Sequence, residues 1–435
     1  MVAKVDTATI SLWGHPVGAI SWLEDRQYGV FEYEPAFLGH HLDIAPIHMG
    51  LAAARAGNRI FSFPALRDPT FLGLPGLVAD ALPDKFGNAI INAWLARRGR
   101  DANSFSPVER LCYLGTRSMG ALEFSPSVNH KLEQAVAVEV AELVALAQEI
   151  MNERAAFSIE IAKNDPKKAE AIQDILRVGT SAGGARPKAV IALNDQGKVL
   201  SGQAEVPRDF SHWLLKFDGV SDLELGAPQE YGRVEYAYYL MAQAAGITMT
   251  ECRLLEENGR AHFMTRRFDR SAEGKLHLQS LCGLAHYDYN QAGAYSYEQA
   301  FMVMRHLRLS KSEAMEQYRR MVFNVLARNQ DDHTKNIAFL MDRQGQWRLS
   351  PAFDITYAHN PKGTWTNQHQ MSLNGKRDNF TREDLLTIGK SISLPRPEEI
   401  LEQAQGAVAR WPEFADRAGL SQRRTDEITG HLRHL

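Results

Sequence analysis

Residues 329–336 read N-Q-D-D-H-T-K-N, and Asp354 follows in the segment P-A-F-D-I. Asn336 stands five positions after Asp331. This is the spacing of the catalytic loop of protein kinases, in which the aspartate accepts the proton of the substrate hydroxyl and the asparagine holds magnesium. Such folds place a second metal-binding aspartate further along the chain. The stretch therefore predicts phosphoryl transfer, with Asp331 as the catalytic residue and with Asn336 and Asp354 as metal ligands.

A hairpin is expected between Asn336 and Asp354. Residues 337–341 are apolar and have the length of a strand, residues 342–345 are typical of a turn, and residues 347–349 can form the returning strand. The hairpin would bring both metal ligands to one end. Because Asp, Asn and His are common in loops, the plainer alternative is a solvated acidic turn beside a hairpin.

A glycine-rich segment, S-A-G-G-A-R-P-K at 181–188, precedes the apolar residues 189–193. Gly183 and Gly184 have no side chain, so the backbone can approach phosphate groups closely. The segment matches neither the Walker A nor the G-x-G-x-x-G pattern, and an ordinary glycine-rich turn is the alternative. Its position before a predicted strand favours a nucleotide loop.

A lysine and a glutamate follow in the order that kinases use. Lys216 lies near the end of the apolar segment 212–217 and would contact phosphates, as the strand lysine of kinases does. Glu235 lies near the start of a helix expected at about 230–245 and could pair with Lys216. The alternatives are an ordinary strand-end lysine and a first-turn glutamate stabilised by the helix dipole. Residues 262–268 have the length of a further strand, which would precede the hinge that meets adenine.

In this order, the segments resemble the HipA family, the serine/threonine-kinase toxins of bacterial toxin–antitoxin pairs. The matching pieces between residues 179 and 359 are S-A-G-G-A-R-P-K, L-L-K-F, E-Y-A-Y-Y-L-M-A-Q-A-A-G-I, R-R-F-D-R, N-Q-D-D-H-T-K-N and P-A-F-D-I. L-P-D at 82–84 and G-T-R-S-M-G-A-L-E-F at 115–124 resemble the family's accessory domain. The resemblance implies an α+β, two-lobed protein-kinase-like fold with a β-rich N-terminal accessory domain.

The resemblance also implies roles for individual residues. It implies that Lys216 contacts the phosphates of ATP. It also implies that Asn336 and Asp354 bind magnesium. The further nucleotide contacts that it implies are Gly183, Gly184, Ala185, Arg186, Pro187 and Lys188 in the loop, Arg266, Arg267 and Phe268 at the hinge, and His333, Lys335 and Asn336 in the catalytic loop. Ser181 falls where family members autophosphorylate, which ejects the loop and silences the kinase. The loop differs from the Q-x-K form of the best-known members, since it has Arg186-Pro187-Lys188.

Cofactors and partners follow from the same resemblance. It implies ATP and Mg²⁺, a HipB-like helix-turn-helix antitoxin, operator DNA bound through that antitoxin, and a protein substrate that is an aminoacyl-tRNA synthetase for some family members. Two other interpretations stay open. One is a small-molecule or lipid kinase of related fold, and the other is a pseudokinase that binds a DNA-bound antitoxin. Intact Lys216, Asp331, Asn336 and Asp354 argue against the pseudokinase.

Composition excludes several classes of protein. The chain has 435 residues, of which 44% are hydrophobic and 23% charged, as is ordinary for a globular protein. The net charge of −3 argues against a stand-alone nucleic-acid binder. No apolar run approaches the ~18 residues that a membrane span needs, and the N-terminus lacks a signal-peptide core, so a cytoplasmic location without membrane contact is expected. Three widely separated cysteines indicate neither a disulfide framework nor a zinc site.

The expected domains are an accessory domain at 1–130, a helical connection at 131–176, a kinase N-lobe at 177–270 and a helical C-lobe at 271–435. Short strands are expected at 7–13, 17–22 and 28–33, and a long amphipathic helix at 131–152. Further helices are expected to start at the capping patterns that begin with Ser106, Ser310 and Thr381.

Overall fold

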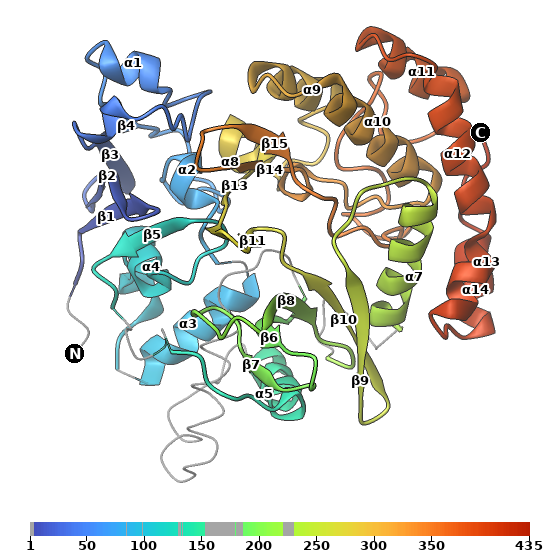
Figure 1. Ribbon diagram of the computed structural model, residues 1–435, viewed down its shortest axis with the longest axis horizontal. Coiled ribbons are helices and arrows are strands. Elements are labelled where there is room, and N and C mark those ends of the chain that lie inside the picture. The colour runs from blue at the N-terminus through green and yellow to red at the C-terminus, as the bar shows by residue number, and fades with distance from the viewer. Residues whose placement is uncertain are drawn as a thin grey trace. The chain divides into compact units, whose positions relative to one another are not determined.

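The computed structural model describes residues 4–83, 85–97, 99–128, 132, 134–152, 179, 186–220 and 230–435. The chain forms two compact units (Figure 1). The first unit comprises Met1–Leu42, Met49–Pro228 and Arg253–His277, and the second comprises Asp43–His48, Gln229–Cys252 and Leu278–Leu435.

The N-terminal part of the first unit is built on an antiparallel five-stranded sheet. Its strand order is β4 (Ile60–Ser62), β3 (Tyr28–Tyr33), β2 (His15–Leu23), β1 (Thr7–Leu12) and β5 (Leu122–Ser125). The three strands expected before residue 34 are thereby confirmed. Alternating residues of β1, from Ala8 to Leu12, are fully buried, as is typical of a sheet with one face on the core.

Short helices accompany this sheet. They are α1 (Leu51–Arg55), α2 (Gly76–Ala79), α3 (Lys85–Arg97) and α4 (Pro107–Leu114). The capping box expected at Ser106 starts α4: the Ser106 hydroxyl accepts the Glu109 amide at 3.2 Å, and the Glu109 carboxylate accepts the Ser106 amide at 2.9 Å. The two bonds satisfy backbone donors that a helix N-terminus otherwise leaves without a partner.

The second sheet of the first unit carries the candidate nucleotide residues. Its order is β7 (Val199–Ser201), β6 (Lys188–Leu193), β8 (Ser211–Lys216), β10 (Arg260–Arg266) and β9 (Cys252–Glu257). A small hairpin of β11 (Arg270–Ser271) and β12 (Gly274–Lys275) follows. The strands expected at 189–193, 212–217 and 262–268 are confirmed, with ends shifted by one or two residues.

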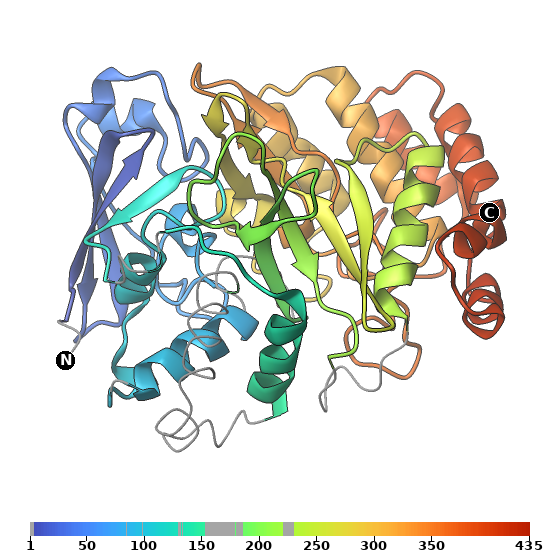
Figure 2. The same cartoon turned by 60° about the horizontal axis from the view of Figure 1, so that its bottom comes forward.

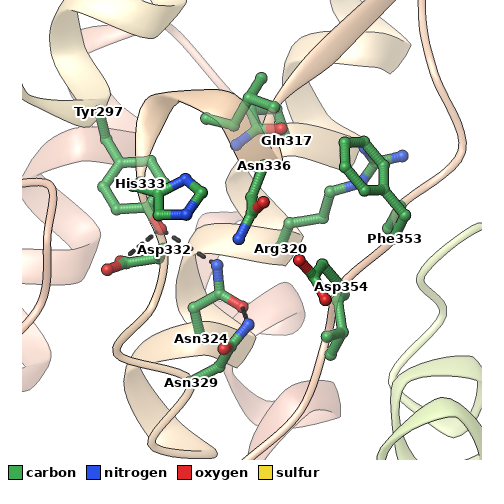
Figure 3. A pocket seen from close by; sticks show the side chains of 13 residues that line it. Tyr297, Gln317, Arg320, Asn324, Asn329, Asp332, His333, Asn336, Phe353 and Asp354 are labelled. Carbon is green, nitrogen blue, oxygen red and sulfur yellow. Dashed lines mark hydrogen bonds between the residues drawn. The ribbon is translucent and has the colours of Figure 1, made fainter. Parts of the chain in front are cut away.

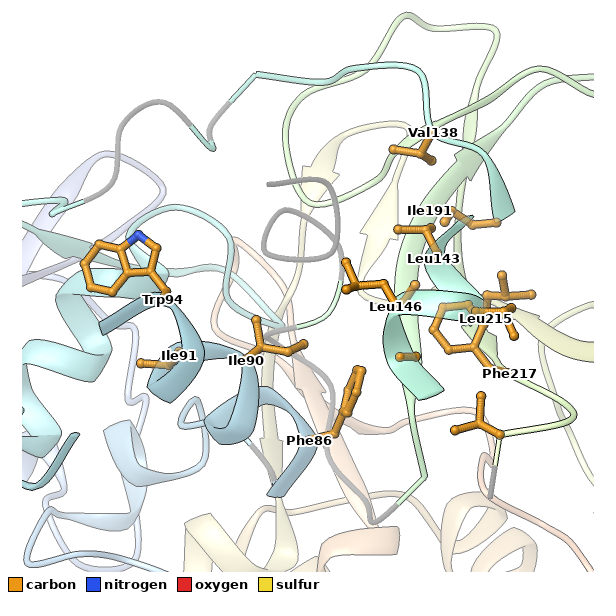
Figure 4. Close-up of a cluster of buried hydrophobic side chains, with 14 of the residues drawn as sticks. Phe86, Ile90, Ile91, Trp94, Val138, Leu143, Leu146, Ile191, Leu215 and Phe217 are labelled. Atoms are coloured by element: carbon orange, nitrogen blue, oxygen red, sulfur yellow. The ribbon is translucent and has the colours of Figure 1, made fainter. Parts of the chain in front are cut away.

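Helices α3 and α5 (Val140–Asn152) share one apolar core with this sheet (Figure 4). Phe86 and Ile90 of α3 pack with Leu143 of α5, and with Ile191 and Leu215 of the strands. Lys188 and Lys216 lie on the opposite face of β6 and β8, because they alternate with the core residues of these strands.

The helix expected at 131–152 is wrong in its first part, because α5 starts only at Val140. Residues before it run alongside β7 instead: Ala137 bridges Leu200, and the Ser201 amide donates to the Val136 carbonyl at 2.8 Å. Val136, Val138 and Val140 alternate with smaller or polar residues, and β-branched residues at a period of two favour an extended chain.

The second unit is mainly helical. Its helices are α7 (Tyr231–Ala244), α8 (Leu281–Ala285), α9 (Tyr297–His306), α10 (Lys311–Leu326), α11 (Arg382–Ser391), α12 (Pro397–Ala409), α13 (Trp411–Arg417) and α14 (Gln422–Thr429). α7 packs along α13 and α12, as Figure 2 shows. Capping boxes at Ser310 and Thr381 start α10 and α11, as expected.

A three-stranded sheet completes the second unit. Its order is β13 (His277–Ser280), β14 (Ala338–Met341) and β15 (Trp347–Leu349). The hairpin expected between Asn336 and Asp354 is confirmed, since β14 and β15 pair antiparallel. Within the described ranges, no helix combines the length and the apolar character that crossing a membrane requires.

Candidate active site

The catalytic-loop candidate connects α10 to β14 and is fixed at several points of its backbone. Thr334 donates its hydroxyl to the Tyr287 carbonyl at 2.7 Å, and the Leu281 amide donates to the Ile337 carbonyl at 2.7 Å. A short 3-10 turn at Thr334–Asn336 ends the loop. These bonds give residues 329–337 one defined path, which sets the directions of the side chains along it.

The Asp331 side chain remains partly open to solvent. It is 37% exposed, and its Oδ1 accepts the indole N–H of Trp365 at 2.6 Å. His333 Nε2 lies 3.8 Å from the same oxygen. Partial withdrawal from water raises the pKa of the Asp331 carboxyl, and the Asp354 and Asp332 carboxylates add to this, while His333 and the Trp365 bond oppose it.

Asp332 is turned the other way and is buried. Its carboxylate accepts hydrogen bonds from the Tyr297 hydroxyl at 2.7 Å, from His369 Nδ1 at 2.8 Å and from the Gln370 backbone N–H at 2.8 Å. Burial by itself raises the pKa of Asp332, but the bonds and charge from His369 and the other donors outweigh it and lower the pKa overall. Asp332 therefore anchors the loop, and of the two adjacent aspartates Asp331 is the one available to a substrate.

Arg433, close to the C-terminus, contacts the imidazole of His369. Arg433 Nη1 lies 3.1 Å from His369 Nε2 and donates to the Val325 carbonyl at 3.0 Å. Arg433 therefore contacts the ring nitrogen of His369 opposite to Nδ1, and Nδ1 faces Asp332. A chain of buried groups thus leads from Arg433 through His369 to Asp332.

Asn336 and Asp354 converge on one pocket (Figure 3). The Asn336 amide nitrogen donates to the Asp331 carbonyl at 2.8 Å, which leaves the Asn336 side-chain oxygen for the pocket. Asp354 adopts a left-handed backbone with φ 56°, a strained conformation that is concentrated at functional sites. The chain before Asp354 is held by the Arg320 guanidinium, which donates to the Ser350 carbonyl at 2.9 Å.

The donor set of this pocket fits magnesium. Besides Asn336 and Asp354, it is lined by Gln317 and Asn329, whose buried oxygens Oε1 and Oδ1 make no hydrogen bond with any described residue. Carboxylate and amide oxygens are the ligands that magnesium prefers, and it retains several waters besides. Among the described residues no group of three or more His, Cys, Asp or Glu side chains could hold a metal, so amide oxygens and substrate phosphates would be needed.

The candidate phosphate-binding lysines are neighbours on the second sheet of the first unit. Lys188 on β6 stands directly opposite Lys216 on β8, and Phe263 on β10 stands on the other side of Lys216. Residues directly opposite on paired strands share a face, and like charges there repel one another. Glu235 is buried in α7 of the second unit, and its predicted pairing with Lys216 stays a prediction.

The predicted hinge, 266–268, contains an arginine with a structural role. The Arg267 guanidinium is buried and donates to Asp269 Oδ1 at 2.9 Å and Oδ2 at 2.6 Å. Asp269 also accepts the Gly120 amide at 2.7 Å and pairs with Arg270 at 2.7 Å. Burial raises the pKa of Asp269, but the two arginines overcome this and hold it well below its usual range. The motifs R-R-F-D-R and G-T-R-S-M-G are thereby joined.

The remaining predicted nucleotide contacts are only partly described. His333 and Lys335 both lie against Tyr289, with ring centroids 5.2 Å apart for His333 and the Lys335 Nζ 5.4 Å from the ring centroid. Arg186 and Pro187 lead into β6. Ser181, Gly183, Gly184 and Ala185 lie outside the described residues, so the nucleotide loop and the autophosphorylation site stay predictions.

Sequence reasoning missed the residues that surround the two aspartates. They are Tyr297, Trp365, His369, Gln370 and Arg433. The segment that carries three of them has no regular helix or strand, and tertiary folding alone brings it to the loop.

Comparison with known proteins identifies the family. The model of the HipA-like C-terminal domain matches residues 180–433, and that of the HipA N-terminal domain matches residues 8–125. A search of curated proteins returned no match.

Among solved structures, the HipA chain of a Shewanella oneidensis MR-1 complex of toxin–antitoxin proteins HipA and HipB with operator DNA is similar. The TM-score is 0.65 at 14% identity, over 98% of this chain and 94% of that chain. A Helicobacter pylori proinflammatory kinase, CtkA, aligns at 14% identity over 51% of this chain and 88% of that chain, with a TM-score of 0.33. The predicted α+β, HipA-like fold with a β-rich N-terminal domain is confirmed, and the chain belongs to the HipA family.

Proposed function

We propose that this HipA family member is an ATP- and magnesium-dependent protein serine/threonine kinase that acts as the growth-arresting toxin of a toxin–antitoxin pair. One observation carries the proposal: a partly open Asp331 lies in the same loop as Asn336, which faces Asp354 across an oxygen-lined pocket. Asp332, its neighbour, is fully engaged and cannot serve. Asp331, Asn336 and Asp354 together supply what phosphoryl transfer requires of a protein, a group that orients the hydroxyl and ligands for the metal.

Each residue has a separate task in this mechanism. The Asp331 carboxylate orients the acceptor hydroxyl and takes its proton as the hydroxyl oxygen bonds to phosphorus and ADP departs. Asn336 and Asp354 would hold magnesium, which neutralises charge on the phosphates when it is bound. Lys188 and Lys216 on one sheet face add positive charge for the phosphates. His333, beside Asp331, adds a further donor at the site.

Self-phosphorylation at Ser181 is part of the proposal. A phosphoserine carries about −1.5 to −2 charges, and within the nucleotide loop this charge would oppose ATP binding. The support is the position of Ser181 two residues before the glycine pair Gly183-Gly184. The modified form is the less active one.

The partners proposed are a HipB-like helix-turn-helix antitoxin, operator DNA through that antitoxin, and a protein substrate, with aminoacyl-tRNA synthetases as the first candidates. Support comes from the family and from the Shewanella oneidensis complex, which contains HipA, HipB and operator DNA. An assembly on operator DNA would act in the cytoplasm.

Induced expression tests the toxin kinase. Cells expressing the wild type should stop growing and gain phosphoserine or phosphothreonine on a few proteins, as measured by phosphoproteomics. Asp331→Ala should abolish both effects, whereas Asp25→Ala, at an exposed turn between β2 and β3, should retain both. Normal growth and an unchanged phosphoproteome with well-expressed wild type would contradict the proposal.

A further inference from the structure

Segment 365–370 contacts both aspartates of the catalytic loop. Trp365 donates its indole N–H to Asp331 Oδ1 at 2.6 Å. His369 Nδ1 bonds to Asp332 Oδ2 and the Gln370 backbone N–H donates to Asp332 Oδ1, both at 2.8 Å. We propose that Trp365 is a positioning residue that holds the Asp331 carboxylate in the orientation in which it receives the acceptor hydroxyl. The inference rests on the proposed kinase function and adds a residue that acts through Asp331.

The hydrogen bond restrains one oxygen of Asp331 and leaves the other available. An indole N–H can only donate, and a bond to an ionised acceptor is among the stronger kinds. His333 Nε2, at 3.8 Å, is beyond hydrogen-bond distance from Oδ1. Within the described part of the chain, Oδ2 makes no hydrogen bond. Trp365 therefore restrains the rotation of the carboxylate and leaves Oδ2 available to an acceptor hydroxyl.

The segment that carries Trp365 is tied into the same buried network as the loop itself. The Gln370 side-chain amide donates to the Trp365 carbonyl, and it also lies 3.4 Å from the Gln330 carbonyl. Gln370 is 3% exposed, and the Asn360 amide donates to the Thr366 carbonyl at 3.1 Å, which closes the loop around Trp365. Because the buried Gln370 holds the backbone of Trp365, the indole has a fixed place from which to position Asp331.

A competing role makes the opposite prediction. If the Trp365 indole occupied the place of the acceptor hydroxyl, the bond to Asp331 would be inhibitory, and its removal would raise the rate. If Trp365 positions Asp331, the removal of the bond lowers kcat, because a carboxylate free to rotate spends less time aligned. The sign of the change in kcat therefore decides between the two roles.

Trp365→Phe removes the N–H and keeps an aromatic ring. We expect kcat to fall about 10- to 100-fold, the range set by loss of one charge-assisted hydrogen bond. The KM for ATP should stay within about twofold, because the indole does not face the oxygen-lined pocket. Trp347→Phe is the matched control, since its indole donates to the Asp43 carbonyl at 3.1 Å, and it should leave kcat unchanged. An unchanged or raised kcat in Trp365→Phe, with wild type active, would overturn the positioning role alone.

The contact can also be measured without catalysis. In NMR spectra with ¹⁵N-labelled tryptophan, the indole resonance that is missing from Trp365→Phe should move when Asp331 is changed to Asn, because the acceptor loses its charge. The Trp347 resonance should stay in place. A Trp365 resonance that is insensitive to Asp331→Asn would overturn the inference even if no phosphoryl transfer were found, so its failure is distinguishable from failure of the proposed function.

Discussion

Asp331 and Asp332 are adjacent in sequence and have opposite environments: the Asp331 side chain is 37% exposed, and that of Asp332 is 1% exposed. Asp332 accepts three hydrogen bonds from two separate parts of the second unit, namely Tyr297 and the adjacent residues His369 and Gln370. Its role is to fix the loop, and the fixed loop presents Asp331. The same two-residue motif thus supplies both the reacting group and its support.

Exchange of each aspartate for asparagine should separate these roles. Asp332→Asn should lower the free energy of unfolding by about 1.5–3 kcal/mol, because a buried charged acceptor is lost from three donors. Asp331→Asn should leave stability within about 0.5 kcal/mol of wild type, since its side chain is partly open. Urea denaturation of the three proteins measures the difference. Equal stability of the two variants would contradict the anchor role of Asp332.

Asp269 should stabilise the first unit. Asp269→Asn leaves Arg267 and Arg270 buried around a neutral amide, and we expect a loss of about 3–5 kcal/mol in the free energy of unfolding. Asp25→Asn is a matched control at a 79% exposed side chain and should change little. Thermal denaturation followed by fluorescence is the measurement, and similar melting temperatures for the two variants would rule out the role.

The lowered pKa of Asp269 predicts a pH dependence of the same contribution. The folded-state pKa lies below the unfolded value of about 3.9, so the stabilisation is present above pH ~4 and is lost as the pH falls below that value. The stability difference between wild type and Asp269→Asn should therefore be constant from pH 7 to 5 and shrink below pH 4. A difference that grows on acidification would contradict the assigned ion pair.

Asp354→Asn should weaken the binding of ATP in the presence of magnesium. Asparagine keeps the shape of the side chain but removes the charge that offsets the cation. Calorimetry with ATP, with and without magnesium, should show a strong magnesium dependence in wild type and a reduced one in the variant. An unchanged magnesium dependence would mean that Asp354 is not a ligand.

Lys216→Ala should reduce both ATP affinity and kcat, because a cation is lost from the face that Lys188 and Lys216 share. Lys198→Ala, at an exposed position in the turn between β6 and β7, provides a control that loses the same single positive charge. Steady-state kinetics with varied ATP measure both quantities. Identical kinetics in the two variants would mean that Lys216 is an ordinary strand-end lysine without a role in nucleotide binding.

Local patterns predicted more of this protein than long-range contacts did. The hairpin from Ala338 to Leu349 and the capping boxes at Ser106, Ser310 and Thr381 follow from residues a few positions apart, and they were confirmed. The helix expected from residue 131 was wrong because pairing with β7 outweighs the helical pattern there.

The candidate site divides in the same way. The spacing of Asp331, Asn336 and Asp354 is visible because one short hairpin separates them. Trp365 and Arg433 reach the catalytic loop only through tertiary folding, and no periodicity or motif marks them. Likewise, the sequence predicted that Arg267 is a hinge residue. Only the structure shows that its side chain binds the buried Asp269.

Transfer of labelled phosphate from ATP by the purified protein tests the central claim most directly. In magnesium, the wild type should label itself or a protein acceptor, and chelation of the metal should stop the reaction. Asp331→Ala should reduce the rate by at least about 100-fold while its melting temperature stays near that of wild type. Equal rates in wild type and a folded Asp331→Ala would contradict the assignment of Asp331 as the residue that activates the acceptor hydroxyl.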